Sequence, residues 1–136
     1  ARLLVVGGDT REPDETQTPE LPRLRRIAEE ARVADRVTFT GHRRRDELRR
    51  YYAAADAFVT TPWYEPFGIT PLEAMACGTP VVGSAVGGVQ YSVDDGVTGF
   101  LVPPNDPQAL AQRLANLHAN PFLAESMGRA GVRRVR

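Results

Sequence analysis

Two glutamates, Glu65 and Glu73, lie eight positions apart and flank a segment typical of the start of a helix. Pro71 suits the first helical position and Thr70 the N-cap, and Glu73 follows Thr70 by three residues, the spacing of a capping box. The first backbone amides of such a helix point outward at the positive end of its dipole, where an anion such as a diphosphate binds well. Gly68 would let the backbone come close to that ligand. The segment therefore combines an anion site with two carboxylates that accept hydrogen bonds.

Each of these features also has a purely structural explanation. Glu73 could serve only as the capping-box partner of Thr70, a role that stabilises a protein by about 1 kcal/mol. Glu65 could be an ordinary acid of a surface loop. An acid pair of the glycoside-hydrolase kind is a further alternative, but the distance between carboxyl groups that would decide it does not follow from residue spacing. The pair Gly87-Gly88 could simply form a turn.

The elements that must position this segment alternate between strands and helices. The continuous apolar run from Leu3 to Val6, closed by a glycine pair, predicts a strand buried on both faces. Such alternation predicts an α/β fold, a Rossmann-like parallel sheet with helices on both faces, whose ligands bind at the carboxyl ends of the strands. Strands are expected at 3–6, 37–40, 57–60, 80–82 and 99–102, and helices near 21–31, 46–55, 107–120 and from 122 onward.

Composition narrows the class of protein. The 136 residues suffice for one domain with a hydrophobic core, and 17 basic residues balance 17 acidic ones. A net charge of zero gives no support for a nucleic-acid partner. The single cysteine, Cys77, excludes an internal disulfide and fits a reducing cytosol, so we expect a cytoplasmic protein. Neither histidine has metal-ligand spacing, so no metal site is predicted.

The segment from Glu65 to Val82, EPFGITPLEAMACGTPVV, closely resembles the Glu-x7-Glu motif of retaining glycosyltransferases with the GT-B fold. These enzymes form the large group also called glycosyltransferase family 4, which includes sucrose-phosphate synthases and bacterial mannosyltransferases. Other blocks follow in the family's order, including VTFTG at 37–41, the Gly87-Gly88 pair and DGVTGFLV at 95–102. The resemblance covers most of the chain and implies the C-terminal half of a GT-B fold.

The resemblance also implies roles for individual residues. Glu65 matches the motif glutamate that lies beside the transferred sugar, and it is the catalytic candidate. Glu73 matches the glutamate that accepts hydrogen bonds from the ribose hydroxyls, and Arg43 falls in the loop whose backbone meets the nucleobase. Four further positions match backbone that faces the sugar and the diphosphate: Phe67, Gly68, Ile69 and Thr70.

The implied reaction moves a sugar from a UDP-, GDP- or ADP-linked donor to an acceptor hydroxyl with retention at the anomeric carbon. Stabilisation of charge on the departing diphosphate is the main catalytic effect expected, without a bound metal or cofactor. The family supplies an Arg and a Lys to the diphosphate from an upstream loop, whereas this chain contains no Lys. We therefore expect residues 1–136 to be a donor-binding domain truncated at both ends, without its acceptor domain and inactive alone. A sucrose-phosphate-synthase-like acceptor is one candidate.

Alternatives from other classes remain. The chain could be a module that binds nucleotide sugars without turnover. A dinucleotide-dependent oxidoreductase is disfavoured because the first strand is followed by Gly7-Gly8-Asp9 and not by G-x-G-x-x-G. The arginine run at 43–45 is most simply a solvated face, with docking to anionic lipid or to the missing domain as alternatives. Tyr91 stands where the family often has an acidic residue, which leaves the identity of the sugar open.

Overall fold

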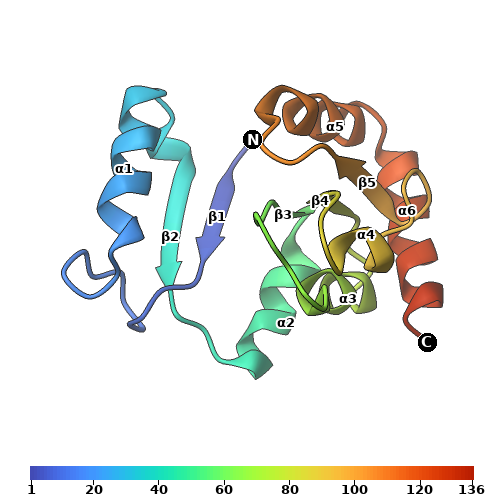
Figure 1. Cartoon of the computed structure of the whole chain (residues 1–136), viewed down its shortest axis with the longest axis horizontal. Helices are drawn as coiled ribbons and strands as arrows, with labels where there is room; N and C mark the ends of the chain where they lie inside the picture. The colour runs from blue at the N-terminus through green and yellow to red at the C-terminus, as the bar shows by residue number, and fades with distance from the viewer. The chain divides into compact units, whose positions relative to one another are not determined.

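The computed structural model describes residues 1–136, which divide into two compact units. We call Ala1–Leu48 the N-terminal unit and Arg49–Arg136 the C-terminal unit, and the division falls within helix α2 (Figure 1). The N-terminal unit contains β1 (Leu3–Val6), α1 (Glu20–Glu30), the short 3-10 helix η1 (Ala34–Arg36) and β2 (Val37–Gly41), and α2 spans Arg45–Ala54. The C-terminal unit contains β3 (Phe58–Thr60), α3 (Ile69–Ala76), β4 (Val81–Ser84), α4 (Val89–Ser92), β5 (Gly99–Val102), α5 (Pro107–Ala119) and α6 (Pro121–Arg134).

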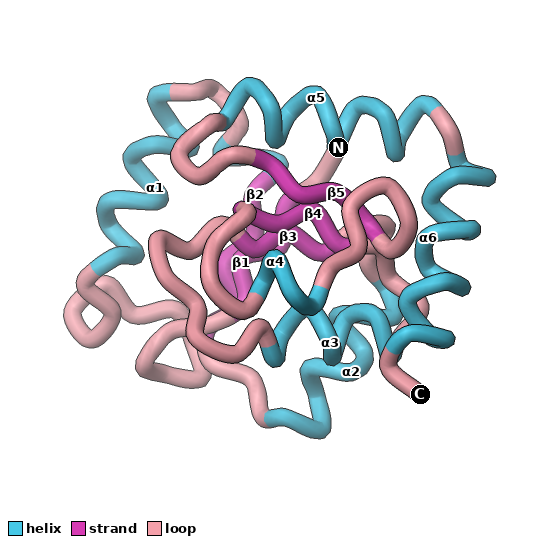
Figure 2. The backbone as a smooth tube through the Cα atoms, turned by 45° about the vertical axis from the view of Figure 1, so that its right-hand side comes forward, coloured by secondary structure: helices cyan, strands magenta, loops and turns pink.

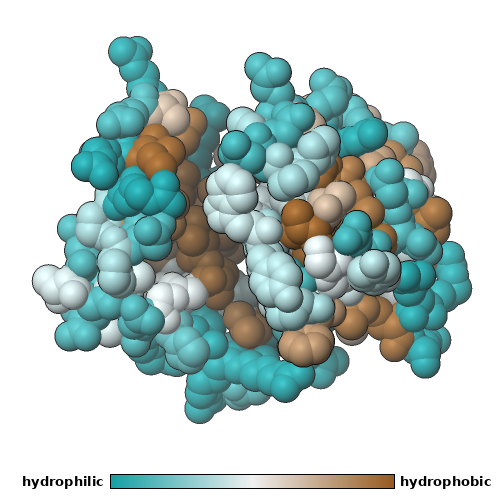
Figure 3. Space-filling model, in the orientation of Figure 1, coloured by the Kyte–Doolittle hydropathy of each residue, from teal (hydrophilic) through white to brown (hydrophobic).

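In the N-terminal unit, β1 and β2 form a two-stranded parallel sheet in which Leu3 pairs with Val37. The strands are connected through α1, as parallel pairing requires a long crossover. Leu3 and Leu4 remain 51% and 50% exposed, so the prediction that this strand is buried on both faces is wrong for the unit as it stands. Burial on both faces needs a layer on each side of the sheet, and this unit has one helix of any length beside its two strands. Hydrophobic residues accordingly reach the surface of this unit in the space-filling view (Figure 3).

In the C-terminal unit, β3, β4 and β5 form a parallel sheet in that order, with β4 in the centre. All four residues of β4 are buried. Val82 packs with Phe100, Leu117 and Met127 in a core that α5 and α6 close. Gly83 faces the opposite side, where a Cβ atom would meet the side chain of Val89 in α4. Helix α5 thus covers one face of the sheet, and α3 with α4 the other (Figure 2).

The predicted combination of parallel strands with flanking helices is confirmed, and most bounds shift by one or two residues. The strands pair as two separate sheets, one in each unit. The sequence pattern missed η1 and α4, which are too short to show a helical repeat of apolar residues. None of the helices has the length and apolar composition that a membrane span requires.

Candidate functional site

Helix α3 begins earlier than the sequence pattern predicts. Its first residue is Ile69, and the N-cap position belongs to Gly68, whose backbone is left-handed at φ 64° and ψ 41°. The prediction of Thr70 as N-cap is therefore wrong, and no side chain caps the helix from that position. Pro71 becomes the third helical residue, where its missing N–H still costs no hydrogen bond within the helix. Because Thr70 is not the N-cap, the capping-box explanation of Glu73 is excluded.

The carboxylate of Glu65 closes the turn that leads into α3. Its Oε1 accepts hydrogen bonds from the backbone amides of Phe67 and Gly68, both at 3.2 Å. Two amides that the sequence predicts to face a ligand are thus occupied by a carboxylate of the same loop. A carboxylate oxygen on adjacent amides shows that this turn accommodates a negatively charged oxygen.

Two glycines after β4 press against this loop. The amide of Gly88 donates to the carbonyl of Glu65 at 2.5 Å. A Cβ atom at Gly87 would overlap that same carbonyl, and one at Gly88 would overlap the backbone of Phe67. A Cβ atom at Gly68 would in turn lie 2.5 Å from both the carbonyl oxygen of Gly88 and the hydroxyl of Ser92. The glycines are needed because two backbone segments touch, a reason that the turn explanation of Gly87-Gly88 did not include.

Glu73 lies in the middle of α3 and is held from α2. The hydroxyl of Tyr52 donates to its Oε2 at 3.0 Å. The Tyr52 ring packs edge-on against Phe58 at 5.2 Å, and the hydroxyl of Thr79 donates to the Tyr52 carbonyl at 2.5 Å. Burial, reinforced by the neighbouring carboxylate, raises the pKa of Tyr52 far above its ordinary value of 10. Tyr52 therefore remains a protonated donor at any physiological pH.

Tyr52 is the residue of this site whose polar role sequence reasoning missed. Helical spacing places Tyr52 on the apolar side of its helix, and the structure confirms that it is buried. A buried tyrosine hydroxyl needs a hydrogen-bond partner, so its burial was the signal that a polar group must lie nearby. Which group it would be depends on the packing of α2 against the rest of the C-terminal unit, which residue spacing does not contain.

A cavity of about 240 Å³ lies at the carboxyl ends of the three strands of the C-terminal unit. Its lining comes from the loops after β3 and β5, the last residues of β4 and β5 and the start of α5, and it includes Thr61, Trp63, Ser84 and Asn105. This is the edge of a parallel sheet where ligands are expected. Glu65 and Glu73 do not line the cavity, and the Glu65 loop lies next to it along the chain. No group of three or more His, Cys, Asp or Glu side chains is placed to hold a metal ion.

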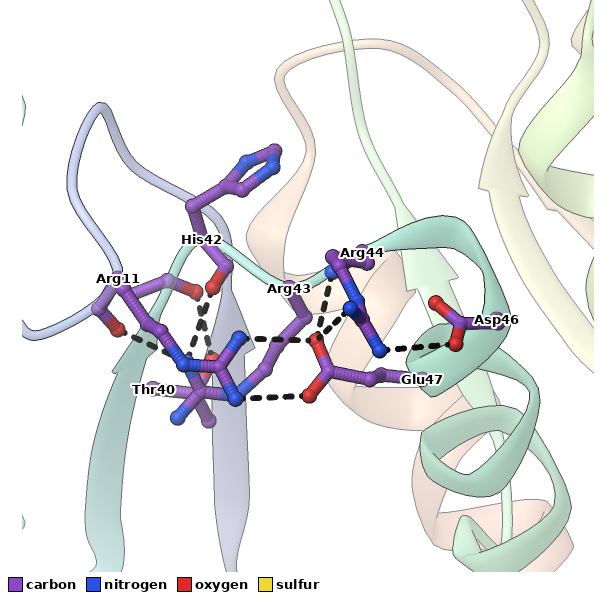
Figure 4. A network of polar contacts seen from close by, with 8 residues as sticks. Arg11, Thr40, His42, Arg43, Arg44, Asp46 and Glu47 are labelled. Atoms are coloured by element: carbon purple, nitrogen blue, oxygen red, sulfur yellow. Dashed lines mark hydrogen bonds and ion pairs between the residues drawn. The ribbon is translucent and has the colours of Figure 1, made fainter.

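Arg43 belongs to the N-terminal unit, where it takes part in a network of polar contacts (Figure 4). Its Nη1 donates to the carbonyls of Arg11 at 2.8 Å and of His42 at 2.9 Å. Beside it, Glu47 accepts two hydrogen bonds from the Arg11 guanidinium, at 2.8 and 3.1 Å, and one from the backbone amide of Arg44 at 2.8 Å. These contacts lower the pKa of Glu47 to about 2. The predicted role of Arg43 near a nucleobase stays a prediction.

Known proteins resemble this chain in sequence and in fold. A family model described as "Glycosyl transferases group 1" matches residues 1–134. The D-inositol 3-phosphate glycosyltransferase of Streptomyces bingchenggensis is 38% identical over 124 residues, which are 91% of this chain and 26% of that protein. The chain therefore spans about a quarter of the length of this curated relative.

Solved structures agree with the family match. The sucrose-phosphate synthase of Thermosynechococcus elongatus superposes with a TM-score of 0.89 at 43% identity, over 98% of this chain and 33% of that one. The HepE protein of Anabaena, solved in complex with UDP, has a TM-score of 0.87 at 27% identity, over 98% of this chain and 35% of that one. The same protein has also been solved with UDP-glucose. The chain therefore belongs to the glycosyl transferases group 1, enzymes with the GT-B fold.

Proposed function

We propose that residues 1–136 form the donor-binding domain of a retaining glycosyltransferase that uses a nucleoside diphosphate sugar. The observation that carries the proposal is the pairing, in one unit, of the Glu65 turn with Glu73 on the helix that the turn begins. HepE, which resembles this chain over 98% of its length, binds UDP and UDP-glucose in its solved complexes. UDP is accordingly the first nucleotide to test.

The proposed chemistry follows from the groups that the turn presents. The bond between the anomeric carbon and the diphosphate oxygen breaks, and a bond from the anomeric carbon to the acceptor oxygen forms on the same face of the sugar. The proton of the acceptor hydroxyl passes to the departing diphosphate. The diphosphate leaves with additional negative charge, which the first amides and the positive end of α3 stabilise. In this proposal Glu65 lies beside the transferred sugar as the catalytic candidate. The backbone from Phe67 to Thr70 faces the sugar and the diphosphate.

Glu73 has the separate task of binding the ribose. A carboxylate accepts hydrogen bonds from two neighbouring hydroxyls, and the Tyr52 hydroxyl holds one oxygen of Glu73 in place. Glu73 does not cap α3, so capping does not explain its position on the helix. The acceptor and the product belong to the longer proteins that this chain partly matches, so they are not assigned.

The experiment is a calorimetric titration of the chain with UDP, GDP and ADP, repeated for Glu73→Ala. We expect one nucleotide to bind selectively, and the variant to bind it more weakly by about 1 to 3 kcal/mol, the usual cost of removing a charged hydrogen-bond partner. Glu125→Ala is the matched control, because Glu125 is exposed on α6 and pairs only with Arg129. Equal affinity of wild type and Glu73→Ala, with the fold intact, would remove Glu73 from the site.

Absence of nucleotide binding in the wild type would contradict the proposal that these 136 residues suffice to bind a donor. The same titration on a chain extended upstream then tests the family's basic loop. Only if binding appears there does the donor-binding assignment survive in a longer chain. Anomeric configuration of a product made by the longer protein, followed by NMR, tests retention.

A further inference from the structure

We propose that Arg134, in the last turn of α6, is a positioning residue for the loop that faces the sugar and diphosphate of the donor. The inference rests on the proposed function for the identity of the ligand. The structural link from Arg134 to the loop stands on its own contacts. Helix α3 packs against both α4 and α6 within the C-terminal unit, and Figures 1 and 2 both show these three helices close together.

The guanidinium of Arg134 makes three hydrogen bonds with the end of α4 and the residues after it. Its Nη2 donates to the carbonyl of Tyr91 at 2.7 Å and its Nε to the carbonyl of Ser92 at 2.8 Å. Its Nη1 donates to Oδ2 of Asp94 at 3.0 Å. The planar fork of an arginine lets one side chain satisfy three acceptors at fixed angles, which no other side chain does.

Helix α4 needs such support because it consists of a single turn, Val89–Ser92. One isolated turn fixes several backbone dihedral angles for very few hydrogen bonds and is unstable alone. The last carbonyls of a helix also lack partners within it. Arg134 supplies partners to two of those carbonyls, across a separation of more than 40 residues in the chain.

The other contacts of α4 reach the Glu65 turn. The buried hydroxyl of Ser92 donates to the carbonyl of Gly68 at 3.0 Å. The carbonyl of the same Ser92 accepts from Arg134, so this residue is held from both sides. The amide of Gly68 donates to Glu65, which continues the link to the carboxylate of the motif. Arg134, Ser92, Gly68 and Glu65 therefore form one continuous series of hydrogen bonds.

Helix α6 is itself firmly placed. A Cβ atom at Gly128 would overlap the carbonyl of Gly78, and one at Gly131 would lie 3.0 Å from the side chain of Met75 in α3. Met127 is almost fully buried. The Arg134 side chain, in contrast, is 37% exposed. Its removal should therefore leave the core intact and change mainly where α4 and the Gly68 carbonyl lie.

The test compares Arg134→Ala with Arg133→Ala. Arg133 occupies the same last turn and is exposed, and the structure gives its side chain no hydrogen bond or ion pair. Calorimetry measures the affinities of both variants for UDP-glucose, UDP and UMP, and thermal unfolding checks the fold. We expect Arg134→Ala to weaken UDP-glucose binding by about 5- to 30-fold and UMP binding much less, because UMP lacks the sugar and the second phosphate. Arg133→Ala should bind all three as the wild type does.

Hydrogen exchange provides a readout that needs no ligand. Amides at 67–70 and 89–93 should exchange faster in Arg134→Ala than in Arg133→Ala, because α4 loses its terminal partners. Ser92→Ala, which removes the hydroxyl donor to Gly68 and keeps the carbonyl, should reproduce the effect on 67–70. The double variant Ser92→Ala/Arg134→Ala should then lose less affinity than the sum of the two single variants.

The outcomes separate the two proposals. If Glu73→Ala weakens binding while Arg134→Ala changes neither affinity nor exchange at 67–70, the positioning role is wrong and the donor site stands. Equal losses for UMP and UDP-glucose in Arg134→Ala would also overturn it, because a general loss of folded protein explains them. If no nucleotide binds but exchange at 67–70 accelerates only in Arg134→Ala, the structural link stands and the proposed ligand is wrong.

Discussion

Both units place a glycine against the backbone of a neighbouring loop, yet they complete the contact differently. In the N-terminal unit, Gly41 lies where a Cβ atom would overlap the carbonyl of Arg11, and Gly87 has the same relation to Glu65 in the C-terminal unit. Around Arg11 the contact is completed by an exposed guanidinium on Glu47 (Figure 4). Around Glu65 it is completed by the Glu65 carboxylate, which accepts from the backbone amides of Phe67 and Gly68, and by the Gly88 amide, which donates to the Glu65 carbonyl.

The comparison teaches which conditions control each loop. Bonds between exposed charges are screened by salt and depend on the protonation of the carboxylate. A contact between two touching backbone segments requires a glycine without a side chain at the point of contact. Such a contact depends little on salt concentration or pH. We therefore expect salt to affect the Arg11 loop, which an ion pair holds, more than the Glu65 loop, where a carboxylate meets backbone amides and three glycines touch backbone.

The strongest test of this contrast is Gly87→Ala against Gly96→Ala. Both glycines have positive φ, 45° and 80°, but a Cβ atom would overlap Glu65 at the first and meet nothing within 4 Å at the second. Alanine in a left-handed backbone costs about 1 to 2 kcal/mol at either site. Overlap at Gly87 should add about 1 to 3 kcal/mol. Denaturant titration measures both, and equal destabilisation would show that the Glu65 loop yields easily.

A smaller loss of free energy is expected from Tyr52→Phe. This variant removes one partly buried hydrogen bond of the C-terminal unit and leaves the packing unchanged. The variant keeps the ring against Phe58 and loses the bond to Glu73. UDP affinity should fall by about 1.5 kcal/mol, roughly tenfold. The control is 2′,3′-dideoxy-UDP, which lacks the ribose hydroxyls and should bind the two proteins equally. A loss of the same size for both ligands would argue against action through Glu73.

The smallest effect is expected in the N-terminal unit, where lowering the pH should weaken the contact between Arg11 and Glu47. Glu47 has a pKa of about 2, below its ordinary value of 4.5, because of the hydrogen bonds from Arg11 and Arg44. A lowered carboxyl pKa stabilises the folded form above pH 4.5, and that contribution disappears as the pH falls from about 4.5 through about 2. Glu47→Gln should remove the part of this pH dependence that comes from Glu47, as the NMR shifts of the Arg11 side chain compared between the two proteins would report. A wild-type loop unchanged down to pH 2 would contradict the charge-dependent contact.

Much of the architecture was predictable because it follows from local patterns. Apolar runs and helical spacing predict the strands and the longer helices within one or two residues. The start of α3 was not predictable in this way. Thr70 has the better N-cap chemistry, but Gly68 takes that position because Gly88 and Ser92 pack against it from a distant segment. A contact between segments 20 residues apart overrides a local preference.

The same reason explains which parts of the candidate site stayed hidden. Glu65 and Glu73 carry their own motif, whereas Tyr52 and Arg134 act through hydrogen bonds to residues far along the chain. The prediction that the leucines of β1 are buried was wrong for a related reason. An apolar run indicates that a strand is suited to burial. Whether the strand is buried depends on the helices and strands that pack on its two faces.

The contact between the Glu65 turn and the Gly87-Gly88 segment has a consequence for engineering this domain. Since the two backbones touch through Gly68, Gly87 and Gly88, neither segment has room to accept a foreign loop while the other is kept. A chimaera that exchanges the Glu65 turn between relatives should transplant 65–70 and 87–92 together. Exchanging either segment alone would place two backbone segments from different proteins in direct contact, where side chains or backbone atoms would overlap.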